Sequence, residues 1–517
     1  MKTTKKILGI SALLPLITAC NEKEQKPMNI LFIMSDDHSY QTISAYDTTF
    51  IHTPNLDRIA NEGVRFNNSF VANSISAPSR ACLLTGKHSM ANGFTDNSCT
   101  FDGSQQTFPK LIQDKYETAI IGKWHLNSDP TGFDHWDILI GQGDYYNPTF
   151  IRNGEKIQRE GYATNVTTDV ALEWLENERN QEKPFCLLLH HKAPHRTWMP
   201  DTCDFKLFKD INFPLPETFY DDYEGRLAAK ENKMSISKDM DLVYDLKLAD
   251  KDSLIHSNPN LEGWGRWMYN NMNPEQKKAW DAHYDVVIEK FKELNPTGEE
   301  LDRWKYQQYM RDYLRVITSI DRNVGRVLDY LEEEGLLENT LIIYTSDQGF
   351  YMGEHGWFDK RWMYEESFRT PLLARLPGSK VKGDIPQMVQ NIFPASDKRE
   401  DRFVLGNSMG SHGAFKWALN RPEFFAAATG MSGAGDLEEL GFYDRMPERV
   451  INAFGTLEEY RGSYNDFKHL YKKHLEEGTD VPRFYACCGT EDGFYAGAKK
   501  FAEDATAAGF PIQFEEG

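Results

Sequence analysis

Residues 29–37 read NILFIMSDD, an apolar run that ends in a serine and two aspartates. A short continuous apolar run bounded by polar residues is typical of a strand buried in a sheet. In open α/β sheets, ligands bind beyond the carboxyl ends of the strands. Asp36 and Asp37 are therefore candidates for a binding site.

Three later segments repeat this pattern. Residues 119–125 read AIIGKWH, residues 185–195 read FCLLLHHKAPH, and residues 341–349 read LIIYTSDQG. Because helical patterns separate these runs, we expect an α/β fold. Strands that deliver Asp, Lys, His and Asp to the same edge of the sheet would form one polar site.

One helix is well specified by its apolar side chains, which recur at alternating spacings of four and three residues. They are Tyr313, Ile317, Ile320, Val324, Val327 and Leu331. Gly335 is expected to end this helix. We interpret the stripe as core and assign it no function.

The overall charge argues against one class of partner. The 517 residues carry 78 acidic and 58 basic side chains, for a formal net charge of −20. Nucleic-acid binding needs clustered Lys and Arg, so no nucleic-acid partner is expected. A diffuse acidic surface mainly keeps a protein soluble.

The first 27 residues are expected to be a targeting segment. Three lysines precede an apolar run, residues 7–19, that is too short to span a bilayer. Residues 17–20 read ITAC, which resembles a bacterial lipobox with Cys20 as the lipidated residue. We therefore expect a signal peptide over 1–20, a tether over 21–27, and an exported lipoprotein of the periplasm or outer membrane, anchored to the membrane by lipid. An ordinary cleaved signal peptide is the alternative.

Residues 76–86 read SAPSRACLLTG. This segment resembles the signature of the sulfatase family: Cys or Ser, any residue, Pro, Ser, Arg, four residues, then Thr-Gly. The resemblance extends to Asp36-Asp37, to residues 122–126 and to residues 346–349, and it covers residues 28–392. It implies an alkaline-phosphatase-like α/β fold and hydrolysis of sulfate esters, similar to the N-acetylglucosamine-6-sulfatases.

In this resemblance, Ser76 is the nucleophile after oxidation to formylglycine (3-oxoalanine). A serine hydroxyl is a poor nucleophile without activation, whereas a hydrated aldehyde can attack with one oxygen and keep a second hydroxyl. The serine form implies a serine-type sulfatase-maturating enzyme as a partner. The alternatives are a plain loop serine, or a phosphatase or phosphodiesterase of the same fold that uses unmodified Ser76.

The resemblance also implies a calcium site. Asp36, Asp37, Asp347 and Gln348 would hold Ca²⁺ together with the oxygen of residue 76. All are hard oxygen donors, which suit Ca²⁺ or Mg²⁺ better than zinc. The alternative for the aspartate pair alone is a turn or a helix N-cap.

The remaining catalytic residues follow from the same resemblance. Arg80 and Lys123 would bind residue 76 and the sulfate oxygens, and His125 would be the base that regenerates the aldehyde. His195 and Lys360 would contact the bridging ester oxygen, with His195 as the proton donor. For the two lysines alone, the alternative is a solvated surface; His190 and His191 are interpreted as structural.

The substrate is suggested by two further segments. Residues 349–361 and residues 141–146 resemble bacterial sulfatases that act on sulfated amino sugars. This implies a sulfated glycan partner, with a 6-O-sulfate of N-acetylglucosamine in host glycosaminoglycans or mucin as the target. Residues 201–295 are expected to form a mostly helical insertion near the cleft.

The sulfatase pattern stops near residue 392. Residues 403–410 read FVLGNSMG, a strand followed by Gly-x-Ser-x-Gly, which is a nucleophile elbow. This part, residues 393–517, resembles α/β-hydrolase esterases, with Ser408 as nucleophile and Asp492 as the triad acid.

This esterase part is expected to be incomplete. Several strands should precede the elbow and a histidine should follow the acid, but neither is present in this sequence. Ser408 and Asp492 are therefore interpreted as vestiges, and a complete miniature esterase is the alternative. The sulfatase part would in turn lack its C-terminal subdomain, so an inactive chimeric lipoprotein remains a further alternative.

Overall fold

The computed structural model describes residues 27–249, 267–378 and 398–516, apart from residues 408 and 434. The chain divides into two compact units, residues 1–384 and 385–517. The signal peptide, Cys20, Ser408 and the expected junction near residue 392 lie outside the described residues. No helix in the described ranges is long and apolar enough to cross a bilayer.

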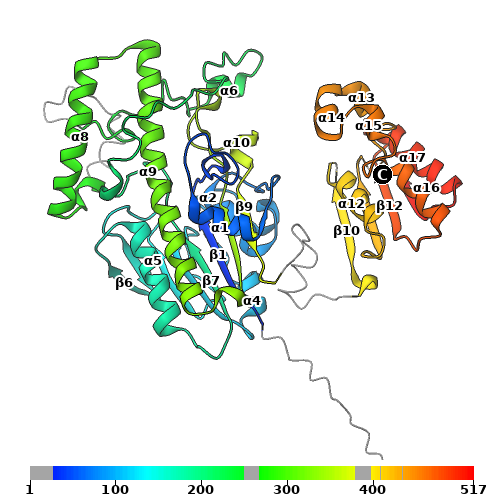
Figure 1. The fold of residues 1–517 in the computed structure, drawn as a ribbon, viewed down its shortest axis with the longest axis horizontal. Coiled ribbons are helices and arrows are strands. Elements are labelled where there is room, and N and C mark those ends of the chain that lie inside the picture. The colour runs from blue at the N-terminus through cyan, green and yellow to red at the C-terminus, as the bar shows by residue number, and fades with distance from the viewer. Residues whose placement is uncertain (1–26, 250–266, 379–397, 408, 434, 517) are drawn as a thin grey trace, which may run out of the picture. The chain divides into compact units, whose positions relative to one another are not determined.

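The first unit contains, within the described residues, a nine-stranded sheet with the order β2-β9-β8-β1-β7-β3-β4-β5-β6 (Figure 1). Its four central strands are parallel: β8 (Thr340–Ser346), β1 (Asn29–Ser35), β7 (Phe185–His190) and β3 (Glu117–Lys123). These are the four strands predicted from the sequence, and the structure makes them direct neighbours.

Shorter strands extend the sheet on both sides. On one side β9 (Leu372–Arg375) and β2 (Val64–Arg65) pair antiparallel. On the other side β4 (His135–Leu139) continues the parallel order, and β5 (Thr149–Arg152) and β6 (Glu155–Gln158) then pair antiparallel. The sheet is therefore mixed, with a parallel centre.

The long helix α9 (Gly298–Glu333) packs with α1 (Pro54–Glu62) and α5 (Ala163–Glu173) against the sheet (Figure 1). All six side chains of the predicted apolar stripe are completely buried. The core interpretation is confirmed. The helix ends at Glu333, and Gly335 follows in the left-handed region with φ +66°.

Short helices and single turns complete this unit. They are η1 (Tyr40–Thr42), α2 (Ser76–Thr85), α3 (Ser89–Asn92), α4 (Phe108–Ile112), η2 (Trp174–Glu178), η3 (Thr202–Asp204), η4 (Leu337–Asn339), η5 (Glu354–Gly356) and α10 (Glu365–Phe368).

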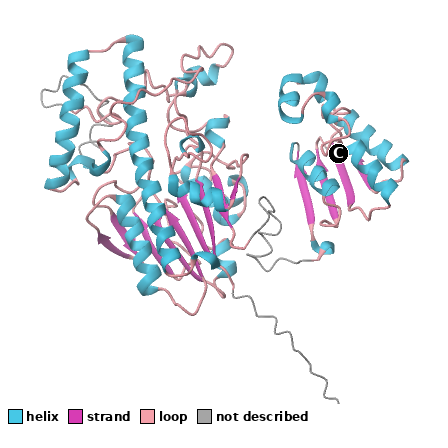
Figure 2. Cartoon of the chain, in the orientation of Figure 1, coloured by secondary structure: helices cyan, strands magenta, loops and turns pink. Residues whose placement is uncertain are grey.

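The expected helical insertion is only partly helical. Among its described residues, the longer helices are α6 (Leu227–Glu231) and α8 (Pro274–Leu294), and residues 267–270 are also helical, whereas turns and irregular chain make up most of residues 205–248 (Figure 2). Pro214 and Pro216 lack an amide N–H, and the Asp- and Gly-containing run 221–225 favours turns. The prediction of a mostly helical segment was therefore wrong for its first half.

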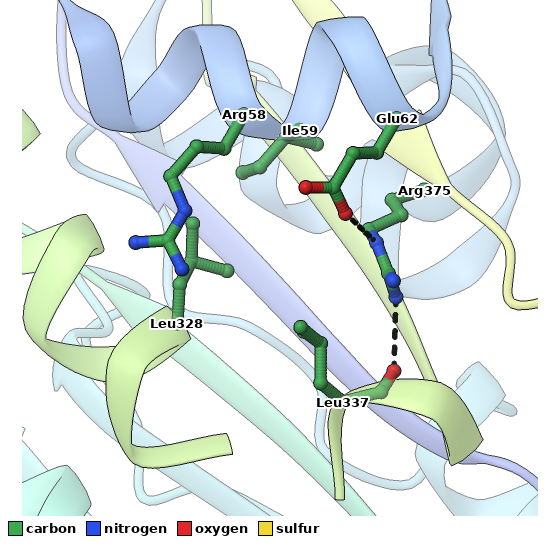
Figure 3. Close-up of a pocket in the computed structure, with 6 residues that line it drawn as sticks. All are labelled: Arg58, Ile59, Glu62, Leu328, Leu337 and Arg375. Atoms are coloured by element: carbon green, nitrogen blue, oxygen red, sulfur yellow. Dashed lines mark hydrogen bonds and ion pairs between the residues drawn. The ribbon is translucent and has the colours of Figure 1, made fainter. Parts of the chain in front are cut away.

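One small pocket lies near the end of β9. There, Nε of Arg375 donates to Oε2 of Glu62 at 2.6 Å, and Nη1 donates to the Leu337 carbonyl at 2.9 Å (Figure 3). Because β9 is antiparallel to β8, this end lies at the amino ends of the central strands. The pocket therefore lies at the edge of the sheet opposite to the predicted site. Its charged residues Arg375 and Glu62 form an ion pair with each other.

The second unit has a parallel four-stranded sheet in the order β10 (Phe403–Asn407), β11 (Ala427–Met431), β12 (Arg483–Cys488), β13 (Ile512–Glu516). The helices among its described residues are η6 (Arg399–Asp401), α12 (Met409–Asn420), α13 (Phe442–Arg445), α14 (Pro447–Phe454), α15 (Leu457–Tyr460), α16 (Phe467–Glu477) and α17 (Tyr495–Ala507). The predicted strand and the helix that follows it are present, whereas Ser408 of the elbow between them lies outside the described residues.

This second unit has one well-covered sheet face. Phe415, Phe467, Phe484 and Phe501 pack together in its core. On the edge strand β10, by contrast, Phe403 and Leu405 are 68% and 67% exposed. Because Val404 between them packs against the core, the four strands form a sheet with its core on one face and exposed apolar side chains of β10 on the other.

Candidate active site

The register of the central strands brings their carboxyl ends to one level. Met34 pairs with His190, Ser35 with Ser346, and Gly122 with His190. The residues that follow these positions therefore emerge side by side. The sequence predicted this convergence, and the structure confirms it.

The turn after β1 is fixed by backbone contacts. The N–H of Asp36 donates to the Ala193 carbonyl at 3.1 Å, and Asp37 adopts the left-handed region with φ +67°. The hydroxyl of Tyr313 donates to the Asp37 carbonyl at 2.7 Å. A non-glycine residue in this conformation is strained and needs such support. Helix α9 thus supports Asp37, while the Ala193 carbonyl fixes Asp36.

Ser76 is the first residue of α2, and its side chain is 1% exposed. Its Oγ donates to Oδ1 of Asp36 at 3.0 Å and accepts from Nε2 of Gln348 at 3.3 Å. Pro78 fits the first turn, where its missing N–H costs nothing. The predicted nucleophile therefore lies among the predicted metal ligands, at a helix N-terminus that favours negative charge.

Three buried cations surround the carboxylates. Nε of Arg80, one turn along α2 from Ser76, donates to Oδ2 of Asp347 at 3.0 Å. Nζ of Lys123 donates to Oδ2 of Asp36, and Nζ of Lys360 donates to Oδ2 of Asp37 at 2.6 Å. The solvated-surface alternative for both lysines is wrong, because they are 0% and 4% exposed.

The carboxylates respond to burial and to these cations. Burial alone would raise the pKa of Asp36, but Lys123 and the other nearby positive charges hold it well below its ordinary value. Burial raises the pKa of Asp37 to about 6 although Lys360 opposes it. Burial, with the charge of Asp36, raises the pKa of Asp347 to about 7. A further cation in contact with Asp37 and Asp347 would stabilise their charged forms.

The two predicted catalytic histidines reach the same site. Nε2 of His195 lies 3.9 Å from Oδ2 of Asp37, and its Nδ1 donates to the Arg196 carbonyl at 2.7 Å. Burial and the charge of Lys360 lower the pKa of His195 well below its ordinary value. Burial and the charge of Lys123 lower the pKa of His125 to about 2. Burial thus favours the neutral form of both imidazoles in this arrangement.

The donor set fits a hard divalent cation. The carboxylates of Asp36, Asp37 and Asp347 face one another through shared hydrogen bonds around Ser76 and Gln348. Oε1 of Gln348 is buried and has no hydrogen-bond partner among the described residues. Carboxylate and amide oxygens are the ligands that Ca²⁺ prefers. The residues present thus match the predicted calcium site.

Two residues of this site were missed from the sequence. Oε1 of Gln142 accepts a hydrogen bond from Nζ of Lys123, and Tyr313 supports Asp37. The sequence connects residues 141–146 only with the substrate and predicts Tyr313 only as part of the core. A tyrosine inside an apolar stripe is one available signal, because a buried hydroxyl needs a partner.

Comparison with known proteins identifies the family of the chain. The parallel centre with its acidic carboxyl edge is the alkaline-phosphatase-like α/β fold of the sulfatases. The Sulfatase family model matches residues 28–397, and the chain belongs to this family. A solved structure in complex with its substrate D-glucosamine-2-N,6-O-disulfate has a TM-score of 0.66 and 51% identity, over 69% of this chain and 72% of that one.

Two curated relatives give a more specific comparison. An N-acetylglucosamine-6-O-sulfatase of Bacteroides thetaiotaomicron is 52% identical over 361 residues, 69% of this chain and 64% of the relative. An arylsulfatase of Clostridium perfringens is 26% identical over 71% of this chain and 73% of the relative. The chain thus spans less than two thirds of the length of the Bacteroides relative.

The second unit resembles another family. The Esterase family model matches residues 307–508, which begins inside α9 of the first unit. In the described part of the second unit, Asp492 accepts a hydrogen bond from Oγ of Ser432, and no histidine ring contacts it. His412 instead stacks on Phe467, with ring centroids 4.4 Å apart. The predicted triad acid thus has no imidazole partner in this unit.

Proposed function

We propose that the protein is a sulfuric ester hydrolase that removes the 6-O-sulfate of N-acetylglucosamine in host glycans. The observation that carries this proposal is the position of Ser76. Its Oγ lies 3.0 Å from the Asp36 carboxylate, inside a buried cluster of carboxylates and cations. The 52% identity to an N-acetylglucosamine-6-O-sulfatase supports this substrate class, as does the sulfated glucosamine bound by the similar solved structure.

The nucleophile is proposed to be a formylglycine made from Ser76. A serine-type maturating enzyme would remove two hydrogens from the CH₂OH group, and water would add to the resulting aldehyde. One hydroxyl of the diol gives its proton to the adjacent Asp36 carboxylate and attacks sulfur. The bond between sulfur and the alcohol oxygen breaks as that oxygen takes a proton from His195. The second hydroxyl then loses its proton, sulfate departs, and the aldehyde returns. No water needs to attack the sulfate ester directly.

The neighbouring residues have distinct proposed roles. Arg80 and Lys123 stabilise the charge that develops on the sulfate oxygens, because they are fixed and desolvated. His125 takes the proton of the second hydroxyl, for which its neutral imidazole is suited. The negative charge of a bound sulfate ester would favour the protonated form of His195. His195 then donates a proton to the leaving alcohol, and Lys360 contacts the bridging oxygen.

Calcium is proposed as the cofactor. Asp36, Asp37, Asp347 and Gln348 would hold it, together with an oxygen of residue 76. When bound, the ion supplies positive charge that polarises the nucleophile and the sulfate. The buried, unpartnered Oε1 of Gln348 supports this assignment.

The test is sulfate release from 6-sulfated N-acetylglucosamine. The chain from Asn21 onward is co-expressed with a serine-type maturating enzyme, beside its Ser76→Ala variant. Release by the parent alone supports the proposal. Equal release by the variant contradicts it. Activity on phosphate esters by a protein whose residue 76 is unmodified serine in mass spectrometry would favour a phosphatase instead.

We further propose that the chain is exported and lipidated at Cys20, with its sulfatase region over 28–392 and an esterase-derived region over 393–517. The lipobox-like residues 17–20 support the export. Incorporation of labelled palmitate that disappears in Cys20→Ala is the expected result. Labelling that persists in the variant would contradict the assignment.

A further inference from the structure

Lys192 is a buried lysine without an anionic partner. It follows β7 and is 6% exposed. Its Nζ lies 4.6 Å from the centroid of the Tyr145 ring. Within the described residues, this ammonium forms no ion pair or hydrogen bond, so the aromatic face is its one close interaction.

The other buried lysines behave differently. Lys123 and Lys360 bond to catalytic carboxylates, and Nζ of Lys247 lies 3.0 Å from Oδ2 of Asp312. Nζ of Lys305 donates to two backbone carbonyls, at 2.8 and 3.0 Å. Burying a charge without such partners is costly. Lys192 is therefore the exception among the buried lysines that the structure describes.

The position of Lys192 connects it with the active site. The hydroxyl of Tyr145, whose ring it covers, donates to the His195 carbonyl at 2.6 Å. Burial, followed by repulsion from Lys123, lowers the pKa of Lys192 to about 8, and attraction to Asp36 opposes this shift. The ammonium thus lies within the electric field of the catalytic cluster without bonding to it.

One carboxylate nearby does not neutralise it. Asp144 precedes Tyr145 and is close enough to Lys192 for electrostatic attraction, although no ion pair joins the two among the described residues. Burial raises the pKa of Asp144 to about 6, and Lys192 only partly opposes that shift. Asp144 attracts the ammonium electrostatically but forms no ion pair or hydrogen bond with it among the described residues, so the N–H donors of Lys192 are available to another anion.

We propose that Lys192 binds a second anionic group of the substrate, distinct from the ester sulfate that is cleaved. This inference rests on the proposed sulfatase function. Arg80, Lys123 and Lys360 are assigned to the oxygens of the ester sulfate, and none of them bonds to Lys192. The second group is an oxyanion on the same glycan, either an N-sulfate or the carboxylate of a neighbouring uronic acid. A charge-assisted hydrogen bond to it would supply the missing partner.

The test compares three substrates on the full chain after maturation. They are 6-sulfated N-acetylglucosamine, D-glucosamine-2-N,6-O-disulfate, and a disaccharide that joins the 6-sulfated sugar to a uronic acid. The parent is expected to have a KM about tenfold lower for the substrate with the recognised second anion. The substrate with the lower KM shows whether the recognised second anion is the N-sulfate or the carboxylate of the uronic acid. Equal KM values for all three would overturn the proposal.

Substitutions then assign the preference to Lys192. Lys192→Gln should remove it by raising KM about tenfold for the dianionic substrate only, with kcat nearly unchanged. Lys192→Arg should keep most of it. Lys156→Gln, on the exposed strand β6, is the matched control. If Lys192→Gln fails to fold, Lys192→Met replaces it with an uncharged chain of similar size. A variant that keeps the preference, or that weakens all substrates equally, would contradict the proposal.

Binding separates this inference from the proposed function. Calorimetry on the Ser76→Ala protein needs no turnover. If the parent releases no sulfate, but Ser76→Ala binds the disulfate more tightly than the double variant with Lys192→Gln, the inference stands and the sulfatase function fails. Equal affinities of these two proteins would overturn the inference.

Discussion

Oγ of Ser76 donates a hydrogen bond to Oδ1 of Asp36, 3.0 Å away and 40 positions earlier in the chain. Ser76 begins α2, whereas Asp36 follows the central strand β1. The contact therefore joins a helix N-terminus to the carboxyl edge of the sheet. The helix N-terminus favours negative charge. The carboxyl edge of the sheet is where α/β folds bind their ligands. Any cation held by Asp36 would also be next to residue 76.

Calcium should therefore stabilise the folded first unit. A ligand that binds only the native state stabilises it by about 2.7 kcal/mol at one hundred times its Kd. In scanning calorimetry, we expect a chelator to lower the Tm of the first unit and calcium to restore it. The effect should disappear in Asp347→Ala, which removes one predicted ligand.

A control isolates the metal site from general charge effects. Asp312 is equally buried, but it pairs with Lys247 at 3.0 Å and Arg315 at 2.9 Å, so it is not available as a ligand. Asp312→Asn should lower the Tm and still respond to calcium. If the Tm of the parent protein changes with neither chelator nor calcium, the assigned metal site is wrong.

The role of His195 predicts a dependence on the leaving group. A general acid contributes roughly 10²–10⁴-fold to the rate, and mainly where the departing alcohol is a poor leaving group. His195→Ala should therefore lose far more activity on a sugar sulfate than on an activated aryl sulfate. His88→Ala, at an exposed position, is the control. Equal losses on both substrates would assign the proton transfer elsewhere, for example to Lys360.

The sequence predicted the centre of the fold well for a physical reason. The four central strands are continuous apolar runs, because side chains on both of their faces are mostly buried. Helix α9 has a regular apolar stripe for the same reason. Each of these elements carries its own pattern, so no knowledge of distant contacts was needed.

The residues that were missed depend on distant contacts. Gln142 meets Lys123 only because β4 lies beside β3, and Tyr313 meets Asp37 only because α9 crosses the end of β1. The irregular segment 205–248 has no period from which its path could be inferred. The order of the strands likewise arises from packing between segments far apart in the chain.

The buried stripe of α9 gives a stability prediction. Ile317 is completely buried in the core, so Ile317→Ala should destabilise the first unit by about 2–5 kcal/mol through lost burial and a cavity. Asp329 on the same helix forms an exposed ion pair with Arg58 at 2.6 Å. Asp329→Ala should cost less than about 1 kcal/mol. Calorimetry of the unfolding of the first unit measures the loss of stability in each variant. Equal losses would contradict the assigned packing.

The second unit should not hydrolyse acyl esters. A serine hydrolase needs an imidazole held by its acid, and Asp492 instead bonds to Ser432. His412 stacks on Phe467, and Nε2 of His474 bonds to the Leu419 carbonyl at 2.6 Å, so both rings are engaged within the core. We expect release of nitrophenol from its short-chain esters to be the same for the parent and for Ser408→Ala. Activity that vanishes in this variant would show a working nucleophile and contradict the interpretation of Ser408 and Asp492 as vestiges.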